Sequence, residues 1–540
     1  MKRFLWLGCV LFLYLICTGC GDTFRPIIIP NPPQFPNPKA SHTVVSINDN
    51  GTAVPGSTMV IDVSGDTDVS VKDVGVAPVH AAQQAANQVL VVNHSVPGQQ
   101  NTVDSLTKLT FNGTVISSAT TISLPTGSEA DFVAVAPLDT TAYVTLSSLN
   151  AVAVVSTTSN NQVATIPVGN TPYAMAVTPD KSKLYVANEG DNTISGFNTV
   201  DRSARVGSPA TTSSAPIWLV PRTDNQRVYV LEQNGTLAWL DTTSTAGPDP
   251  LTETAISVPN ATTMTYDPNK NRLYIAGGNP GEPQVAIVDV SQSAPVLLKT
   301  ISIPPFTLLN LSSVPAIAAA AAALPDASRA YLASYATLPS QFTVSSVMGD
   351  GTTATYAYTL TSGHDLTPGV SVTVTGTQQN GFDGTFVIGA IVSGTTACPG
   401  TCFQVPNLTT LSSMSVTASG TGSNIFPQVT VVDVASNTIK STFGIPGFPD
   451  ATVVGSPYYV SACVAPTTFP APTTFRFMMA AGGDSSRAYL SSCDGGNVNI
   501  IDTSVDNYIL NLPAPVGSRA PIPPSQLNPP QNPMFLIAGP

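Results

Sequence analysis

A unit of 42 to 45 residues that recurs along the chain constrains its fold more than any other feature. The clearest copy is Thr171 to Thr199, TPYAMAVTPDKSKLYVANEGDNTISGFNT, in which three short apolar runs alternate with polar turns. Tyr185 lies in the middle run, and steps of 42, 44 and 45 residues connect the equivalent Tyr143, Tyr185, Tyr229 and Tyr274. Short runs rich in Val, Tyr and Thr are typical of β-strands, and this period matches one four-stranded blade per repeat. The pattern predicts an all-β β-propeller.

The number of blades follows from the repeats and from the two ends of the chain. Seven units show the second-strand landmark, at Leu90, Tyr143, Tyr185, Tyr229, Tyr274, Tyr331 and Tyr489. Residues 42–48, 59–62 and 67–74 resemble second, third and fourth strands that lack a first strand, and residues 532–537 resemble a first strand. Combining them would close the ring and remove an exposed sheet edge. We therefore predict about eight four-stranded blades, with seven as the alternative if one divergent unit is only a loop.

The first strand of each blade is expected to line the central channel, where the blades converge and small side chains fit best. Residues 74–77, 133–136 and 174–177 match this expectation. Residues 316–323 are mostly alanine, which favours a helix. They precede a Pro-Asp pair in the first-strand position, so we interpret them as a first strand, with a short helix as the alternative.

One blade is interrupted. The step from Tyr331 to Tyr489 is 158 residues, and the third strand of that blade resumes near residue 428. The excess, residues 341–423, alternates Thr, Val and Tyr with Gly-rich turns and is predicted to be a small β module. Its residues 363–386 resemble small β-barrel repeats of bacterial surface and phage-tail proteins. A second excess, residues 446–474, is predicted to be a loop held by its cysteine.

The N-terminus has the pattern of a secretory signal. Lys2 and Arg3 precede an apolar run, small residues and Cys20. This resembles a bacterial lipobox, which implies lipid attachment at Cys20, although Cys17 stands where an aliphatic residue is usual. The alternative is an ordinary cleaved signal. Residues 25–38 are rich in proline and favour an extended tether, or else a loop packed on the body.

The predicted domain organisation has five parts. These are a lipoprotein signal peptide (1–19), a lipidated cysteine with a Pro-rich tether (20–40), the first part of the propeller (41–340), the inserted module (341–423), and the last part of the propeller with a ring-closing strand (424–540).

Four further cysteines are consistent with export. Cys398, Cys402, Cys463 and Cys493 could form two disulfides. Cys398 and Cys402 enclose a Pro-Gly turn and could staple a hairpin, which leaves Cys463 to pair with Cys493. A redox or metal site is disfavoured, because three residues separate Cys398 from Cys402 and no histidine lies near.

The segment around Tyr185, Leu184-Tyr185-Val186-Ala187-Asn188, is similar to the signature of the YVTN family of β-propeller repeats. The resemblance covers about residues 42–540 apart from the insertion. It implies a propeller fold but no particular activity, because such repeats occur in surface-layer, adhesive and uncharacterised exported proteins. The recurring tyrosines are interpreted as core residues.

The composition excludes several function classes. The formal charge is −12, and removal of Lys2 and Arg3 with the signal leaves 18 basic against 32 acidic residues, or −14. Nucleic acid is therefore not expected as a partner. The histidines, His42, His80, His94 and His364, form no spaced metal pair, and no nucleophile elbow, phosphate loop or dinucleotide fingerprint occurs. We predict no catalytic residue, no metal and no cofactor, and we interpret His80 as structural even if it faces the channel.

Two functions remain open. The favoured one is a non-enzymatic, lipid-anchored propeller of the bacterial cell envelope, periplasmic or at the cell surface, that binds protein or glycan through its loops and inserted module. The alternative is a propeller enzyme of the lactonase type, to which YVTN repeats are structurally akin. That enzyme would gather Glu, His, Arg or a metal at one mouth of the channel. The ligand, the leaflet and the oligomeric state are not specified by the sequence.

Overall fold

The computed structural model describes most of the chain after residue 41. The described residues are 42–50, 54–85, 87–95, 102–261, 263–279, 282–306, 316–363, 365–366, 371–395, 398–445, 448–449, 476–493, 496–514 and 532–538. Within them the chain forms strands and two short 3-10 helices, η1 (Ser147–Leu149) and η2 (Glu189–Asp191), and no α-helix.

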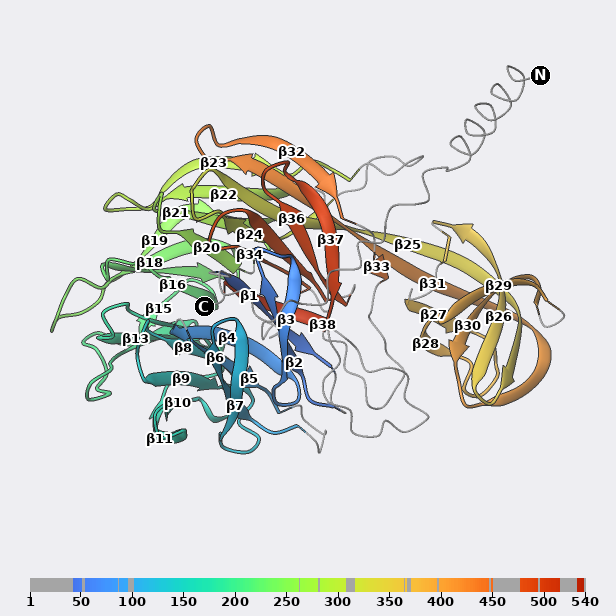
Figure 1. The fold of residues 1–540 in the computed structure, drawn as a ribbon, viewed down its shortest axis with the longest axis horizontal. Coiled ribbons are helices and arrows are strands. Elements are labelled where there is room, and N and C mark those ends of the chain that lie inside the picture. Colours follow the sequence, from blue (N-terminus) through green and yellow to red (C-terminus); the bar gives the residue numbers. More distant parts are fainter. Residues whose placement is uncertain are drawn as a thin grey trace, which may run out of the picture. The chain divides into compact units, whose positions relative to one another are not determined.

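The strands form eight antiparallel sheets, one for each blade of a propeller (Figure 1). From inner to outer strand, blade 1 consists of β38 (Asn532–Ala538), β1 (Thr43–Asp49), β2 (Ser57–Asp62) and β3 (Thr67–Asp73). Blade 2 consists of β4 (Pro78–Ala85), β5 (Gln88–Asn93), β6 (Ser105–Asn112) and β7 (Val115–Ser123). Blade 3 consists of β8 (Ala130–Val135), β9 (Thr141–Leu146), β10 (Ala151–Ser156) and β11 (Asn161–Pro167).

The remaining blades follow the same order. Blade 4 consists of β12 (Pro172–Val177), β13 (Lys183–Asn188), β14 (Thr193–Asn198) and β15 (Ala210–Thr211), and blade 5 of β16 (Pro216–Pro221), β17 (Arg227–Glu232), β18 (Thr236–Asp241) and β19 (Leu251–Ser257). Blade 6 consists of β20 (Thr263–Asp267), β21 (Arg272–Asn279), β22 (Glu282–Asp289) and β23 (Val296–Ser302). Blade 7 consists of β24 (Ile317–Ala323), β25 (Arg329–Asp350), β31 (Thr410–Asp433) and β32 (Thr438–Gly444), and blade 8 of β34 (Phe477–Ala481), β35 (Arg487–Ser492), β36 (Asn497–Asp502) and β37 (Asn507–Pro513).

The eight inner strands close a ring. Each inner strand contacts those of the two neighbouring blades, in the order β38, β4, β8, β12, β16, β20, β24, β34 and back to β38. The ring closes in blade 1, where β38 pairs antiparallel with β1 in a register that includes Val45 opposite Ile537 and Ile47 opposite Phe535. The prediction of a propeller with eight four-stranded blades is confirmed.

Two predictions about first strands had different outcomes. The alanine-rich segment is a strand, β24, because it pairs along its length with β25 and its alanines pack between larger neighbours. Residues 74–77 are not a first strand. They form the connection from β3 to β4, so the first strand of blade 2 starts four residues later than the sequence pattern suggested, at Pro78.

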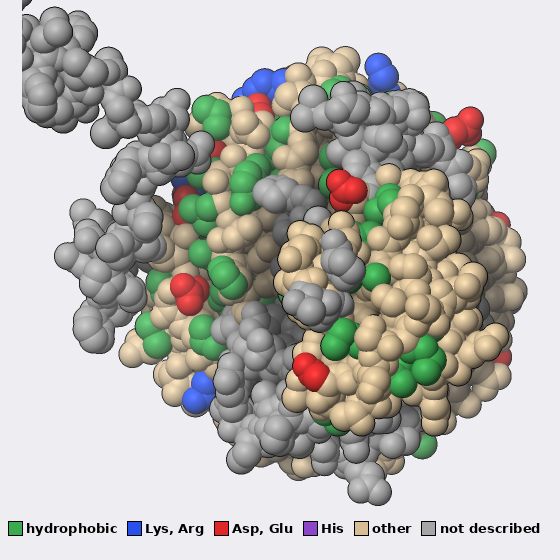
Figure 2. All heavy atoms as spheres, turned by 90° about the vertical axis from the view of Figure 1, so that its right-hand side faces the viewer, with side chains coloured by type: hydrophobic (Ala, Val, Ile, Leu, Met, Phe, Trp, Pro, Cys, Tyr) green, Lys and Arg blue, Asp and Glu red, His purple; other side chains and the backbone are tan. Residues whose placement is uncertain are grey.

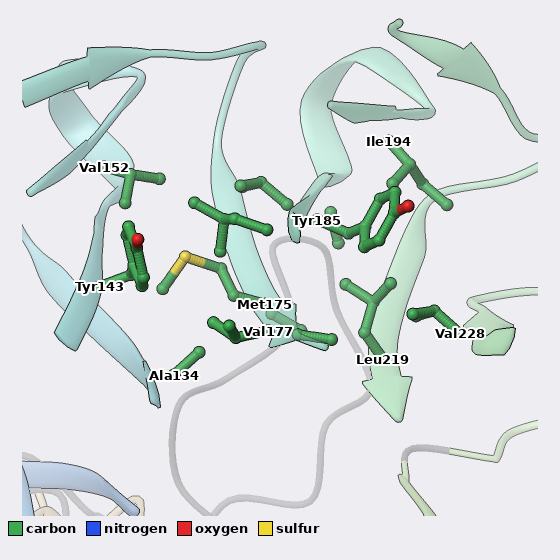
Figure 3. Close-up of a cluster of buried hydrophobic side chains, with 14 of the residues drawn as sticks. Ala134, Tyr143, Val152, Met175, Val177, Tyr185, Ile194, Leu219 and Val228 are labelled. Atoms are coloured by element: carbon green, nitrogen blue, oxygen red, sulfur yellow. The ribbon is translucent and has the colours of Figure 1, made fainter. Parts of the chain in front are cut away.

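Adjacent blades pack against each other through apolar side chains (Figure 3). In the cluster between blades 3, 4 and 5, Met175 from the inner strand of blade 4 lies with Tyr143 of blade 3, and Tyr185 lies with Leu219 and Val228 of blade 5. Each fully buried side chain of this kind contributes about 1.5–3 kcal/mol. The repeat therefore places one large side chain of the second strand in every blade interface, where it stabilises the ring.

The inserted module is continuous with blade 7, because two strands of the blade extend into it. Its other strands are β26 (Thr353–Ser362), β27 (Ser371–Thr375), β28 (Gly384–Val387), β29 (Ala390–Thr395) and β30 (Cys398–Pro406). A short strand from the connection after β32, β33 (Phe448–Pro449), pairs with β31 at Asn424 and Ile425. β25 and β31 remain paired from Arg329 opposite Asp433 to Asp350 opposite Thr410. The limits predicted from the sequence, Gln341 and Ser423, fall inside these two strands.

The module has its own core. The rings of Phe342, Tyr356, Phe382 and Phe403 are at most 1% exposed, and those of Tyr356 and Phe403 stack at 4.9 Å. This core is separate from the clusters between the blades. The module is therefore a folded unit that is joined to blade 7 by a continuous two-stranded ribbon.

Candidate functional site

The antiparallel order of each blade gives the propeller two unlike faces. Connections from first to second and from third to fourth strand lie on one face, which we call the turn face. Connections from second to third strand and from one blade to the next lie on the other, which we call the loop face. The module, the longest of the described connections, belongs to the loop face. Because binding residues concentrate on loops that a rigid scaffold positions, the loop face is the candidate functional surface.

Aromatic side chains from five inner strands meet near the ring axis. His80 of β4 stacks on Phe132 of β8 with ring centroids 3.7 Å apart, and it lies 4.6 Å from Phe535 of β38. Phe132 also makes edge contacts with Tyr173 of β12 at 6.1 Å and with Trp218 of β16 at 5.6 Å. Since blades 2, 3 and 5 meet here although 2 and 5 are not neighbours, these rings fill the centre of the propeller at this level.

The expectation of small side chains along the channel is wrong at these positions. The pairing of the first with the second strand shifts register near the start of β4, β8, β12 and β16, at the residues that carry the rings. A β-bulge redirects a side chain relative to simple alternation. A large residue can then point to the axis, which the alternating pattern in the sequence does not reveal.

His80 belongs to this packing and is held neutral. It is 6% exposed, and its Nδ1 lies 3.3 Å from the backbone N–H of Val133, which donates to it. Burial lowers the pKa of His80 to about 3. An uncharged imidazole stacked on Phe132 fits a structural role.

A second histidine lies on the loop face in an ion pair. His94, which follows β5, lies with its Nδ1 2.9 Å from Oδ1 of Asp131 and 3.1 Å from the carbonyl of Ala130. Burial alone would lower the pKa of His94, but Asp131, Ala130 and the nearby Asp104 outweigh it and raise that pKa above the usual value. The pair connects blade 2 to the first strand of blade 3, with Asp131 only 8% exposed.

Asp104 holds the same junction together from below the surface. Its carboxylate is fully buried and accepts hydrogen bonds from the N–H and Oγ of Ser95 at 2.9 and 2.6 Å, and from the N–H groups of Ser128 and Ala130 at 2.8 Å each. Burial would raise the pKa of Asp104, but these four hydrogen bonds lower it overall. The Asp104 carboxylate therefore has a structural role: it links the connection that contains Ser95 to the connection that contains Ser128.

Two more carboxylates are buried farther around the loop face. Glu189 is 1% exposed, and its charge and that of Asp131 both act on Tyr173, whose pKa is raised well above normal, chiefly by burial. Glu232 is fully buried and accepts from Oγ of Ser213 at 2.7 Å. Ser213 also donates its N–H to Glu253 at 2.7 Å, so one serine bridges two carboxylates. The loop face therefore carries acidic groups and one histidine at the junctions of blades 2 to 5.

The turn face carries a recurring contact that the sequence analysis missed. In five blades a basic residue two positions before the buried tyrosine reaches the turn between the third and fourth strands of the next blade. Lys183, Arg227, Arg272, Arg329 and Arg487 make these contacts to Asp249, Ser293, Val434, Asp506 and Asp66, respectively. The corresponding sequence pattern is a Lys or Arg two positions before the Tyr of the second strand. It indicates blade-to-blade fastening.

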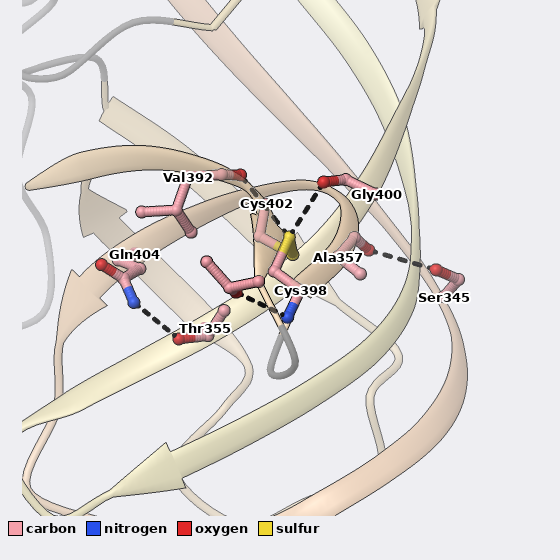
Figure 4. Close-up of a disulfide and its surroundings, with 9 residues drawn as sticks. Ser345, Thr355, Ala357, Val392, Cys398, Gly400, Cys402 and Gln404 are labelled. Atoms are coloured by element: carbon pink, nitrogen blue, oxygen red, sulfur yellow. Dashed lines mark hydrogen bonds between the residues drawn. A yellow bond between two sulfur atoms is a disulfide. The ribbon is translucent and has the colours of Figure 1, made fainter.

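The predicted disulfide residues lie in two places. Cys398 and Cys402 form a disulfide with a Cα–Cα distance of 6.0 Å, at the end of the β29–β30 hairpin of the module (Figure 4). Both are fully buried. Cys493 follows β35 and is also disulfide-bonded. Its predicted partner Cys463 and the predicted lipid site Cys20 lie outside the described residues.

Two features are absent from the described part of the chain. No group of three or more His, Cys, Asp and Glu side chains in that part of the chain is arranged to hold a metal ion. None of its helices has the length and apolarity needed to cross a membrane.

Comparisons with known proteins give only distant structural matches. Neither a family model nor a curated protein matches the chain. Matching solved structures include apo AztD from Citrobacter koseri, which is 10% identical over 92% of this chain and 98% of that chain with a TM-score of 0.48. The periplasmic gluconolactonase PpgL from Pseudomonas aeruginosa is 10% identical over 92% and 99%, with a TM-score of 0.44. Hydrazine synthase from Kuenenia stuttgartiensis is 13% identical over 80% and 96%, with a TM-score of 0.41. With TM-scores below 0.5, these likenesses assign neither a family nor a function to this chain.

Proposed function

We propose that this chain is a lipid-anchored β-propeller of the bacterial cell envelope that binds a protein or glycan through its loop face without catalysing a reaction. The observation that carries this proposal is the distribution of connections. The module extends from the loop face of blade 7, whereas rings from five inner strands fill the centre of the propeller. Binding at such a face needs contact area and no dedicated catalytic group.

The anchor and the family assignment are part of the same proposal. Lipid attachment at Cys20 and membership of the YVTN repeat family rest on the sequence motifs. Metabolic labelling with a radioactive fatty acid tests the anchor. We expect label in the wild-type chain and none in Cys20→Ser, together with release of that variant from the membrane fraction; equal labelling of both would refute it.

Partner capture tests the binding role. Purified chain would be used to capture partners from envelope extracts, beside a variant in which a two-residue Asn-Gly turn replaces residues 339–423. This replacement keeps the ribbon in register, because Leu338 pairs with Asn424, and Asn-Gly is a favoured hairpin turn. We expect a partner that the wild type captures and the variant loses. Capture of the same partners by both would exclude the module from binding.

A lactonase is the second candidate, and a specific observation favours it. His94 and Asp131 lie 2.9 Å apart on the loop face, and the charges of Asp131 and Glu189 both act on Tyr173. Acidic groups and a histidine at one mouth are what that enzyme class would require. PpgL, among the matched structures, is named as a gluconolactonase.

Hydrolysis of a sugar lactone, followed by proton release at constant pH, distinguishes the two functions. An enzyme would exceed the spontaneous rate and would lose that excess in Asp131→Asn. Asp201→Asn on the turn face serves as the matched control. A wild-type rate equal to the buffer rate would reject the lactonase.

A further inference from the structure

Each blade ends at an outer strand, and the far edge of that strand pairs with no other strand of the described chain. The outer strands are β3, β7, β11, β15, β19, β23, β32 and β37, and the structure describes all eight (Figure 1). An open edge presents unpaired backbone N–H and C=O groups that can pair with another chain. Proteins usually protect such edges with charged side chains, with very short strands or with a covering element. The eight edges can therefore be compared for the protection that each has.

The outer strand of blade 6, β23, is exposed on both of its faces. Val296, Leu297 and Leu298 are 49%, 44% and 38% exposed, and the two residues that follow them are exposed as well. Because successive side chains of a strand point to opposite faces, this run shows that neither neighbouring blade covers β23. Elsewhere outer strands support each other: β3 lies against β7, β7 against β11, and β32 against β37. Among the described residues, β23 has no comparable contact with β19 or β32.

The other outer strands carry no apolar run of this kind. Each has at most one exposed large apolar side chain, and these are Val71, Val163, Ile439 and Ile509. Charged residues occur in β3, β19 and β32, and β15 is only two residues long. The face that carries the module likewise shows apolar side chains in small separate groups (Figure 2). An open edge with three consecutive exposed apolar residues is thus particular to β23 among the eight outer strands.

The charge around β23 permits a contact between two copies of the chain. Residues 290–303 contain no Asp or Glu, and Lys299 is their only charged residue. The whole chain has a formal charge of −12, so two copies repel each other over most of their surfaces. A contact at β23 brings together segments without carboxylates. In an antiparallel pair related by a two-fold axis, the apolar run of one copy also lies against the same run of the other.

We propose that β23 pairs with β23 of a second copy of this chain, in an antiparallel contact that joins the two copies of blade 6 into one sheet. This goes beyond the proposed function, because it uses the rim of the propeller and not its loop face. Backbone hydrogen bonds pair the two open edges, and the apolar side chains of the two copies bury each other. One seven-residue strand is a small interface beside the about 800 Å² per partner of a stable complex. The dimer is therefore weak and forms at high local concentration, whereas the dilute chain is a monomer.

Sedimentation velocity over a series of protein concentrations tests the proposal on the full chain in detergent. The test variant is Leu297→Lys, which places like charges on the two sides of the contact. The matched control is Ile509→Lys, which makes the same change at a 40% exposed position of another outer strand, β37. Both substitutions replace exposed side chains, and circular dichroism verifies that both variants fold.

Cross-linking provides a second measurement that does not depend on the strength of the dimer. Leu298→Cys and the control Ile509→Cys are treated with a short bis-maleimide at high protein concentration. Cys398, Cys402 and Cys493 are disulfide-bonded and do not compete for the reagent. The wild type treated in the same way gives the background from any other thiol.

We expect the wild type and Ile509→Lys to change from monomer to dimer as the concentration rises. Leu297→Lys should need about tenfold more protein, because the substitution acts twice in a two-fold contact and each cross-strand pair contributes part of the pairing energy. Leu298→Cys should cross-link as a dimer above the background, and Ile509→Cys should not. Undiminished association of Leu297→Lys, equal cross-linking of the two cysteine variants, or a monomeric wild type at every concentration would overturn the proposal. Partner capture by the loop face is measured separately, so its result does not depend on this one.

Discussion

Asp249 offers a sharp test of how the blades are fastened. Its carboxylate is 4% exposed and receives Lys183 at 2.8 Å, Arg205 at 2.8 and 3.1 Å, and the hydroxyl of Tyr185 at 2.8 Å. Lys183 and Tyr185 belong to blade 4 and Asp249 to the turn of blade 5. Burial alone would raise the pKa of Asp249, but these hydrogen bonds hold it below its usual value.

We expect Asp249→Asn to lower the free energy of unfolding by about 3 kcal/mol. Removing one partner of a buried ion pair costs about 3–5 kcal/mol, because the remaining charge is buried without compensation. The lower end applies because the carbonyls of Thr242 and Ser244 still accept from Lys183, at 2.7 and 2.6 Å. Arg205 likewise keeps its carbonyl partners in the same turn.

Urea-induced unfolding followed by tryptophan fluorescence measures this loss, with Asp201→Asn as an exposed control in the preceding blade. Because the folded pKa of Asp249 is depressed, its contribution is present above its unfolded value and is lost as pH falls through the folded pKa. The gap between wild type and variant should therefore narrow below about pH 4. A loss under about 1 kcal/mol at pH 7, the range of exposed pairs, would refute the assignment of this network as a fastening.

Three further predictions concern other parts of the chain. Glu232→Gln should raise the melting temperature at pH 7, because burial, and then Glu253, raise the pKa of Glu232 and the wild type loses stability as pH rises through that pKa. Thermal scans from pH 4 to 8 check this, and a constant difference in melting temperature between variant and wild type would contradict it. The double variant Cys398→Ser, Cys402→Ser should destabilise the module by about 2 kcal/mol, the loop-closure value for so short a ring. Limited proteolysis should then cleave faster between residues 341 and 423, and unchanged cleavage would argue against a stabilising disulfide. Deletion of residues 532–540 should expose the unpaired edge of β1 and produce oligomers on gel filtration. A peptide of those residues, added in trans, should restore the monomer. A deletion variant that is monomeric without the peptide would contradict the ring-closing role of β38.

The repeat made most of the propeller predictable. The tyrosine steps locate second strands because every copy of the tyrosine is buried in the same position of the blade interface, as Tyr185, Tyr229 and Tyr331 are. The predicted first strand at the C-terminus was recognisable because it lacked partners of its own. Such local patterns survive divergence because each copy meets the same packing constraint.

The loop face was less predictable, for physical reasons. The rings of Phe132 and Trp218 point to the axis at register shifts, which depend on pairing with the next strand and leave no simple period in the sequence. The pair formed by His94 and Asp131 joins connections of different blades, so spacing along the chain gives no sign of it.

The pairing of β38 with β1 has a consequence for how the protein folds. Translation runs from the N-terminus, so β1, β2 and β3 are made before β38, their partner in blade 1. Ring closure must join residues separated by almost the whole described sequence, which is a slow kind of step. Copies that stop early cannot complete blade 1, and their open edge exposes them to proteases and to aggregation. One seven-residue strand, through its pairing with β1, thus makes closure of the ring wait for the last described segment of the chain.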